Sequence, residues 1–191
     1  MSISAVLLAG GKSRRMGEDK ATILFRSVPL WKIQLELLRQ LEPHELFVSA
    51  RTDPVWHPAD AQFVADQLPS RGPVSGIAAA LSRISSDHLL VLAIDMPFMT
   101  ENYLRGLCER VRTGSGIVPV IESRFEPLAA VYPREVCHDV VATLSGNDFS
   151  LQSLISKLIA ANKLEPVQVS KEEKALFHNL NEPRDFKSSC R

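Results

Sequence analysis

The sequence has few cysteines and no two of them close together. Cys108, Cys137 and Cys190 are odd in number and widely spaced, with no C-x-x-C pair and no histidine at zinc-ligand spacing. This pattern argues against a disulfide framework and against a structural zinc site. We therefore expect reduced, unpaired thiols and a cytoplasmic protein.

Long hydrophobic runs and net charge are also absent. No apolar stretch approaches the roughly 20 residues of a membrane span, and residues 3–9 are too short for a signal peptide. The 22 Lys and Arg residues balance the 22 Asp and Glu residues, so the formal net charge is +0. A neutral chain lacks the long-range field that attracts proteins to nucleic acid or anionic membranes, so we expect neither as a partner.

Two common phosphate-binding motifs are missing, although residues 8–20 are rich in glycines and cations. Glycines allow backbone N–H groups to approach an anion, and Lys and Arg side chains can neutralise it. The triplet 11–13 cannot end a P-loop because position 6 is Val6, and adjacent Gly10 and Gly11 do not fit G-x-G-x-x-G,. The segment is predicted to hold polyphosphate in another way, the alternative being an ordinary surface turn.

Short apolar runs alternate with segments of helical periodicity, which predicts an α/β fold with a mostly parallel sheet. The length of 191 residues suits one domain, residues 1–191,. Strands are expected at residues 3–9, 46–50, 62–65, 88–94, 116–121 and around 167–169. Helices are expected at residues 30–41 and 73–84 and after the caps Thr100, Ser150 and Asn181. Residues 124–132 follow a turn and not a helix, so they are predicted to add an antiparallel strand at the sheet edge.

Two aspartates follow predicted strands, at the edge where open parallel sheets bind ligands. Asp66 comes directly after residues 62–65 and is either a ligand contact or a helix cap. Asp95 ends the apolar run 89–94, where a carboxylate is costly to bury unless a cation or strong hydrogen-bond donors pair with it. Mg²⁺ takes one or two carboxylates together with substrate phosphates, so it is the natural partner of Asp95. A capped turn before Pro97 is the alternative.

Two further segments carry candidate binding groups. Gly72 and Gly76 lie four residues apart at the start of a predicted helix, where they allow close approach of a base or ribose or tight packing on the sheet. Asn179 and Asn181 place two amides on one side of an extended chain, and either could reach a metal or a ligand. Helix capping explains Asn181 equally well.

The pattern Leu8-Ala9-Gly10-Gly11-x-Ser13-x-Arg15-Met16-Gly17-x-Asp19-Lys20 resembles the signature of the nucleotidyltransferases related to molybdenum cofactor guanylyltransferase. Residues 72–76 resemble the family's G-P-L-x-G element, residues 95–97 its D-x-P, and residues 179–183 its N-x-N-x-P. The resemblance covers nearly the whole chain. It implies a three-layer Rossmann-like sandwich and Mg²⁺-dependent transfer of a nucleoside monophosphate to a phosphorylated acceptor. In the guanylyltransferases the donor is GTP and the acceptor is molybdopterin.

The resemblance also implies a role for each candidate residue. The backbone of Leu8, Ala9 and Gly10 would read the guanine, with Asp66, Gly72 and Gly76 completing the nucleotide site. The groups at the phosphates would be Gly11, Arg15 and Lys20, and Asp95 would bind magnesium. Asn179 and Asn181 would lie on the acceptor or second-metal side. Ser49 stands where the family has an asparagine and lacks the paired donor and acceptor of an amide.

Several alternatives stay open. Gly10 favours GTP over CTP because the cytidylyl relatives carry alanine at this position, but a cytidylyltransferase acting on the same cofactor remains an alternative. So does a nucleotidyltransferase for a sugar phosphate or another small acceptor. A nucleotide-binding regulator without transfer activity is disfavoured by intact Arg15, Lys20 and Asp95. Proteins that deliver or receive the cofactor are candidate partners. The turn at residues 122–126 either lines the acceptor side or is a solvated hairpin tip.

Overall fold

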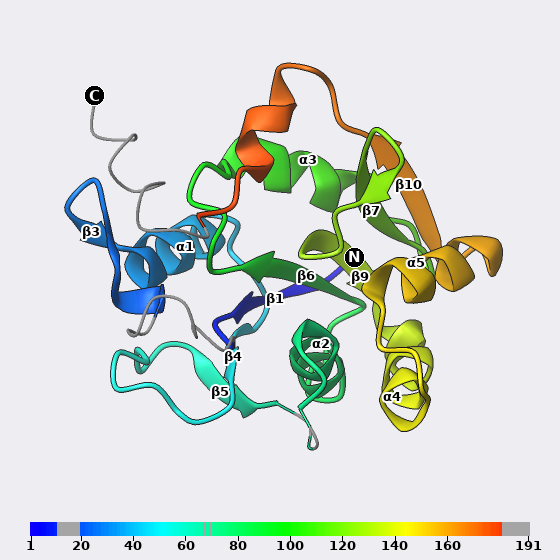
Figure 1. The fold of residues 1–191 in the computed structure, drawn as a ribbon, viewed down its shortest axis with the longest axis horizontal. Coiled ribbons are helices and arrows are strands. Elements are labelled where there is room, and N and C mark those ends of the chain that lie inside the picture. The colour runs from blue at the N-terminus through cyan, green and yellow to red at the C-terminus, as the bar shows by residue number, and fades with distance from the viewer. Residues whose placement is uncertain (11–19, 67, 69, 181–191) are drawn as a thin grey trace.

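The computed structural model describes residues 1–10, 20–66, 68 and 70–180. Their main feature is an eight-stranded sheet (Figure 1). Its strands are β1 (Ile3–Leu8), β4 (Leu46–Ala50), β5 (Gln62–Ala65), β6 (His88–Ala93), β7 (Gly116–Ile121), β8 (Arg124–Phe125), β9 (Ala129–Pro133) and β10 (Leu164–Gln168). The strand order is β10-β7-β9-β6-β1-β4-β5, with β8 paired to β7 beside this path. The mostly parallel α/β sheet is therefore confirmed.

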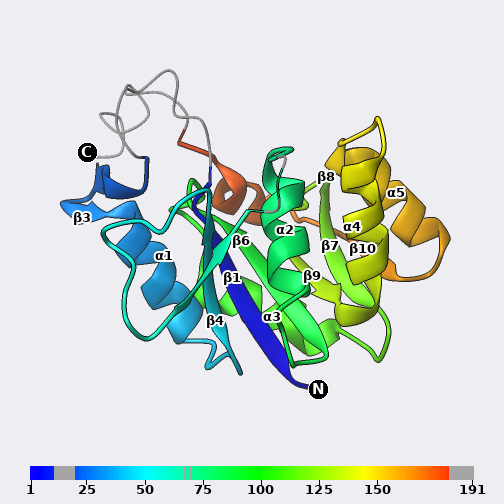
Figure 2. The same cartoon turned by 90° about the horizontal axis from the view of Figure 1, so that it is seen from below.

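Helices cover both faces of this sheet (Figure 2). The helices are α1 (Leu30–Arg39), α2 (Pro73–Leu81), α3 (Glu101–Arg110), α4 (Cys137–Ser145) and α5 (Leu151–Ala160), with the short 3-10 helices η1 (Lys20–Thr22), η2 (Arg134–Val136) and η3 (Glu173–Phe177). One hydrophobic core joins α1, α3 and η3 to the sheet, and a second joins α2, α4 and α5 to the opposite face. The three-layer sandwich is thus present.

The sequence locates most of these elements closely. Strands β4, β5 and β7 have the predicted bounds, and β1 and β6 end one residue early. Every residue of β4 and β6 is buried, as expected for central strands that form continuous apolar runs,. The Thr100 hydroxyl accepts the Tyr103 N–H at 3.4 Å, and the Ser150 hydroxyl accepts the Ser153 N–H at 3.4 Å. Both predicted helix caps are confirmed.

The antiparallel strand differs from its predicted position. It lies inside the sheet, where β9 runs antiparallel to both β6 and β7, whereas the path ends at β10 and β5. The predicted single strand is also divided into β8 and β9 by residues 126–128. Pro127 in this break has no N–H with which to continue a ladder. The antiparallel element is confirmed, but its position at the edge is wrong.

Other elements were not expected from the sequence. Helix α4 carries Cys137, Val140, Val141 and Leu144 at helical spacing, and this apolar stripe packs on the second core,. The strands β2 (Leu24–Phe25) and β3 (Val28–Pro29) form a separate two-stranded antiparallel sheet. The helix predicted after Asn181 lies outside the described residues. Among the helices that the structure describes, none is long and apolar enough to cross a membrane.

Candidate functional site

The parallel strands β1, β4, β5 and β6 bring their carboxyl ends to one edge of the sheet, which is the upper edge in Figure 2. Backbone hydrogen bonds continue past the strand ends. The Ala9 N–H donates to Ser49 O at 2.8 Å, and the Ile94 N–H donates to Leu8 O at 3.1 Å. The Asp66 N–H donates to Ala50 O at 3.0 Å. These bonds fix the backbone positions of the residues that leave the sheet at this carboxyl edge.

Asp66 is held at this edge by two serine hydroxyls. Ser49 Oγ donates to Asp66 Oδ1 at 3.1 Å, and Ser70 Oγ donates to Asp66 Oδ2 at 3.4 Å. Ser49 is 1% exposed, so it meets Asp66 below the surface. It therefore orients a carboxylate where the family's asparagine was expected. This contact is not predictable from the sequence, because Ser49 lies in β4 and Asp66 follows β5.

Two of the candidate glycines lie against this carboxylate. A Cβ atom on Gly10 would come within 3.2 Å of Asp66 Oδ2. A Cβ atom on Gly76, in α2, would come within 2.8 Å of Ser49 Oγ and 2.9 Å of Leu8 Cδ2. Packing of α2 on the sheet is therefore sufficient to explain Gly76. Gly10, Ser49, Asp66 and Gly76 form one compact group.

Gly72 has a different reason to be glycine. Its φ is +77°, a conformation that residues with a Cβ rarely adopt,. No other atom lies within 4 Å of an added Cβ at this position, among the residues that the structure describes. The turn is completed by the Arg71 N–H, which donates to Ser75 Oγ at 2.8 Å. Gly72 thus supplies the backbone turn that begins α2.

Asp95 forms an ion pair with Lys20. Lys20 Nζ lies 2.9 Å from Asp95 Oδ2, and the two side chains are 19% and 23% exposed. Lys20 thus compensates the charge of this carboxylate, and Mg²⁺ binding by Asp95 stays a prediction. The Leu180 N–H donates to Asp95 O at 3.0 Å, which brings the candidate Asn179 to the same edge. In the part of the chain that is described, no three His, Cys, Asp or Glu side chains gather as a metal cluster.

The remaining candidates are Gly11, Arg15 and Asn181. All three lie outside the described residues. Their predicted roles at the phosphates and on the acceptor side stay predictions.

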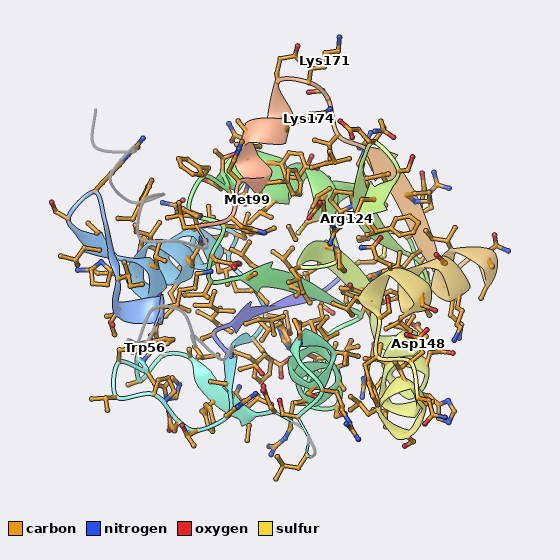
Figure 3. All side chains as sticks on the ribbon, in the orientation of Figure 1. Trp56, Met99, Arg124, Asp148, Lys171 and Lys174 are labelled. Carbon is orange, nitrogen blue, oxygen red and sulfur yellow. The ribbon has the colours of Figure 1, made fainter. Side chains whose placement is uncertain are left out.

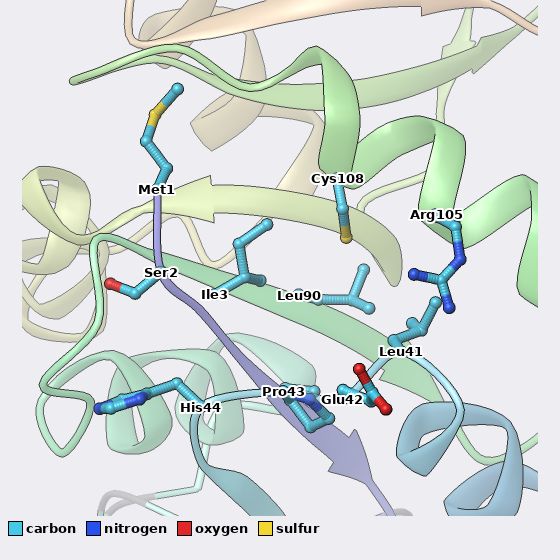
Figure 4. Close-up of a pocket in the computed structure, with 11 residues that line it drawn as sticks. Met1, Ser2, Ile3, Leu41, Glu42, Pro43, His44, Leu90, Arg105 and Cys108 are labelled. Atoms are coloured by element: carbon cyan, nitrogen blue, oxygen red, sulfur yellow. The ribbon is translucent and has the colours of Figure 1, made fainter.

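A cavity of about 350 Å³ lies at the opposite edge of the sheet, where β1 begins (Figure 4). Its wall includes Arg105 and Cys108 from α3. Arg105 donates to Glu101 Oε1 at 2.6 Å and to Gln40 O at 2.7 Å. Burial raises the pKa of the Cys108 thiol to about 11, so the thiol is protonated and weakly nucleophilic at neutral pH,. Neither side chain gives this cavity a reactive group, and the candidate site remains at the carboxyl edge.

Comparison with known proteins agrees with this fold. The family model of the MobA-like NTP transferase domain matches residues 5–164. A probable molybdenum cofactor guanylyltransferase of Opitutus terrae is 30% identical, covering 96% of this chain and 93% of its own length. One of Methanothermobacter thermautotrophicus is 32% identical, covering 96% and 97%. The crystal structure of molybdopterin-guanine dinucleotide biosynthesis protein A from Archaeoglobus fulgidus has the same fold, with a TM-score of 0.80 at 23% identity over 97% and 96% of the two chains.

The fold, the polar carboxyl edge and these matches define the protein as a nucleotidyltransferase. The family match spans most of the chain. The chain belongs to the family of the MobA-like NTP transferase domain.

Proposed function

We propose that this protein transfers GMP from GTP to the terminal phosphate of molybdopterin, with Mg²⁺, and releases pyrophosphate. The names of the relatives support this donor and this acceptor. The observation that carries the proposal is the ion pair of Lys20 and Asp95 at the same sheet edge as Gly10 and Asp66. We further propose that residues 1–191 act as one domain in the cytoplasm, which suits the unpaired thiols of Cys108 and Cys137,.

The nucleoside is assigned to the β1–β4–β5 part of the edge. The sheet bonds of Leu8 O and Ala9 N hold the backbone that leads into Gly10. This backbone is therefore oriented before a guanine arrives, which lowers the ordering cost of binding. Asp66, held by two serine hydroxyls, would accept hydrogen bonds from the nucleoside, and the turn at Gly72 would bring backbone groups close to it.

The phosphates are assigned to Lys20 and Asp95, together with Gly11 and Arg15. Asp95 fits Mg²⁺, because this ion prefers few protein carboxylates and completes its shell with phosphates and water. When bound there, Mg²⁺ would neutralise charge on the α-phosphate and on the leaving pyrophosphate. Lys20 would then exchange its carboxylate partner for a phosphate oxygen. Asn179, next to the residue whose N–H bonds to Asp95, would lie on the acceptor or second-metal side.

The transfer needs little proton chemistry from the protein. An oxygen of the acceptor phosphate attacks the α-phosphorus of GTP, a new phosphoanhydride bond forms, and the bond to pyrophosphate breaks. The acceptor phosphate is already anionic at neutral pH because its second pKa is about 6. No general base is therefore required. Lys20 and Arg15 would act by positioning the phosphates and stabilising their charge.

A product assay tests the function. The protein is incubated with Mg²⁺, molybdopterin and each nucleoside triphosphate in turn, and pyrophosphate release and the dinucleotide product are measured. We expect turnover with GTP. Turnover with CTP alone would identify a cytidylyltransferase on the same cofactor. Nucleotide binding without pyrophosphate release would identify a regulator, and turnover with a sugar phosphate alone would change the acceptor.

Gly10→Ala is expected to reduce kcat/KM for GTP by about tenfold and to shift the preference toward CTP. The new methyl carbon would lie 3.2 Å from Asp66 Oδ2, so the carboxylate must shift away from it. Such a shift in a group that contacts the nucleoside costs about 1–2 kcal/mol of binding. The ratio of kcat/KM values for GTP and CTP measures the effect. Gly106→Ala, in α3, is the matched control, because an added Cβ there meets none of the described residues outside its own helix within 4 Å. An unchanged ratio in Gly10→Ala would remove Gly10 from base selection.

Lys20→Ala is expected to lower kcat by about 10- to 100-fold in a folded protein. The variant loses a charge-assisted hydrogen bond, worth about 1.5–3 kcal/mol, to the phosphates. Steady-state rates and a thermal unfolding curve measure both properties. Lys32→Ala removes an exposed lysine from α1 and serves as the control. If kcat of the folded Lys20→Ala variant equals that of the parent, Lys20 has no role at the phosphates.

A further inference from the structure

The carboxyl edge continues beyond Asp95 to residues 126–128, which precede β9. Strand β9 begins where β6 ends, and the Ala93 N–H donates to Leu128 O at 2.9 Å. The Glu126 N–H donates to Pro119 O of β7 at 2.8 Å. Glu126 therefore lies at the same edge as Asp95, on the side away from Gly10.

The segment that carries Glu126 is fixed on both sides. Gln152 of α5 makes two hydrogen bonds to the backbone of Phe125. Its Oε1 accepts the Phe125 N–H at 3.1 Å, and its Nε2 donates to Phe125 O at 2.8 Å. The buried Tyr132 hydroxyl donates to Pro127 O at 2.8 Å. The end of the predicted turn is thus built into the sheet edge and is not a solvated tip.

An ion pair connects the turn at residues 122–126 to η3. Lys174 Nζ lies 3.0 Å from Glu122 Oε1. Figure 3 labels Lys174 on η3 and Arg124 on the neighbouring β8. This ion pair is exposed, so it places the turn beside η3 but contributes little stability,.

The carboxylate of Glu126 is half-buried. Burial raises its pKa, and the nearby positive charge of Arg124 opposes this shift. Among the described residues, no hydrogen bond or ion pair engages its side chain. Half-burial of a carboxylate that no hydrogen bond or ion pair engages is unfavourable, and groups of this kind are frequent in binding sites.

An aromatic pair lies on the same side of the sheet. Tyr103 of α3 and Phe177 of η3 meet edge to face, with ring centroids 5.3 Å apart. Tyr103 lies in the first turn of α3, and burial raises the pKa of its hydroxyl. The chain continues from Phe177 to Leu180, whose N–H donates to Asp95 O. An aromatic surface, a carboxylate and the candidate metal ligand thus adjoin one another.

We propose that the Glu126 carboxylate binds the amino-pyrimidinone edge of the acceptor, through the ring N–H and the exocyclic amino group. This inference rests on the proposed function. Two adjacent N–H donors match the two oxygens of one carboxylate, and such bonds are stronger than those between neutral groups. The planar ring system of the pterin would lie beside Tyr103.

Guanine presents the same two N–H donors, so the guanine site and the pterin site must be distinguished. The nucleoside residues Gly10 and Asp66 follow β1 and β5, whereas Glu126 precedes β9, on the other side of β6. The spacing from β9 to β1 is two strands, about 10 Å. Asp95 and Lys20 lie between the two regions. The guanine is thereby assigned to one side of the ion pair and the pterin to the other, with both phosphates directed toward it.

Glu126→Gln tests this assignment because it keeps the shape of the side chain and replaces one acceptor oxygen with a donor. We expect the KM for molybdopterin to rise about tenfold or more, while the KM for GTP and the Mg²⁺ requirement stay unchanged. Glu165→Gln, at an exposed carboxylate on β10, is the matched control. A KM for GTP that rises in Glu126→Gln, together with a lost preference for GTP over ITP, would assign Glu126 to guanine and overturn the proposal. A shifted Mg²⁺ titration would overturn it as well, by making Glu126 a metal ligand.

A direct binding measurement separates this inference from the proposed function. Phosphorylated 6-hydroxymethylpterin is fluorescent, and its titration with parent and variant protein requires no transfer reaction. We expect weaker binding by Glu126→Gln and parental binding by Glu165→Gln. If the parent transfers GMP to molybdopterin but Glu126→Gln binds the pterin and turns over normally, the inference fails and the function stands. If the parent transfers nothing but binds the pterin through Glu126, the function fails and the inference stands.

Stability against pH provides the folding control for Glu126→Gln. A raised pKa means that the native state holds the Glu126 proton more tightly than the unfolded chain does, so ionisation lowers stability as pH rises through the raised pKa,. The variant is therefore expected to be more stable than the parent at neutral pH. The gain should vanish below the ordinary pKa of a glutamate. A variant less stable than the parent at pH 7 would make Glu126 a structural residue and overturn the proposal.

Discussion

Asp95→Asn is expected to lower kcat by about 100-fold or more and to raise the Mg²⁺ concentration that gives half-maximal rate. The amide keeps the shape of the carboxylate but carries no charge for a hard cation. It also removes the counter-charge of Lys20, whose Nζ lies 2.9 Å from Asp95 Oδ2 in the parent. Initial rates of pyrophosphate release over a Mg²⁺ titration, with GTP and molybdopterin, measure both changes.

The stability of Asp95→Asn separates a metal ligand from a helix cap or a simple ion pair. Water reaches both Lys20 and Asp95, so the loss of their interaction is expected to cost about 1 kcal/mol,. Asp139→Asn breaks a comparable pair, with Lys163 Nζ at 2.7 Å, near the opposite edge of the sheet. It should show a similar loss of stability and parental kinetics. Superimposable Mg²⁺ titrations of Asp95→Asn and the parent would contradict metal binding.

The sequence predicts several strands well because the information that specifies them is local. Strands β4, β5 and β7 are short apolar runs bounded by polar or turn residues, and the structure has them at the predicted bounds. The helices that begin after Thr100 and Ser150 carry their own hydroxyl caps. The position of β9 within the sheet depends instead on pairing with distant strands, which periodicity does not encode. Helix α4 is different, because its apolar stripe at residues 137, 140, 141 and 144 is local information that predicts a helix,.

The candidate site also has residues that the sequence predicts and contacts that it does not. Asp66 and Asp95 are predictable because each follows an apolar strand, and strand ends define the ligand edge. The need of Asp95 for a cation is also predictable, but its identity as Lys20 requires the fold. The support of Asp66 by Ser49 and the half-burial of Glu126 are not predictable, because each depends on neighbours from other strands. Residue type and order indicate the chemistry, whereas the partners that orient each group come from the tertiary structure.

Gly116→Ala is expected to destabilise the protein by about 3 kcal/mol, the largest effect on stability that we predict. Gly116 begins β7, and its N–H donates to Lys163 O at 3.0 Å. A Cβ atom there would overlap the backbone carbonyl of Val131 in β9 and come within 2.8 Å of Pro133 Cδ. Backbone in the interior of a sheet cannot move aside as the end of a side chain can. Strand β9 occupies its internal position because residue 116 has no side chain.

Urea and thermal unfolding measure this effect. For a chain of this length, about 3 kcal/mol corresponds to a fall in Tm of roughly 6–12 °C. The urea midpoint should fall with an unchanged m value, since the same surface is exposed on unfolding. Gly106→Ala should match or exceed the parent in stability, because alanine favours the helix and the added Cβ meets no described residue outside α3 within 4 Å,. If Gly116→Ala were as stable as Gly106→Ala, β9 could not approach β7 as closely as the structure requires, and the edge position predicted from the sequence would be restored.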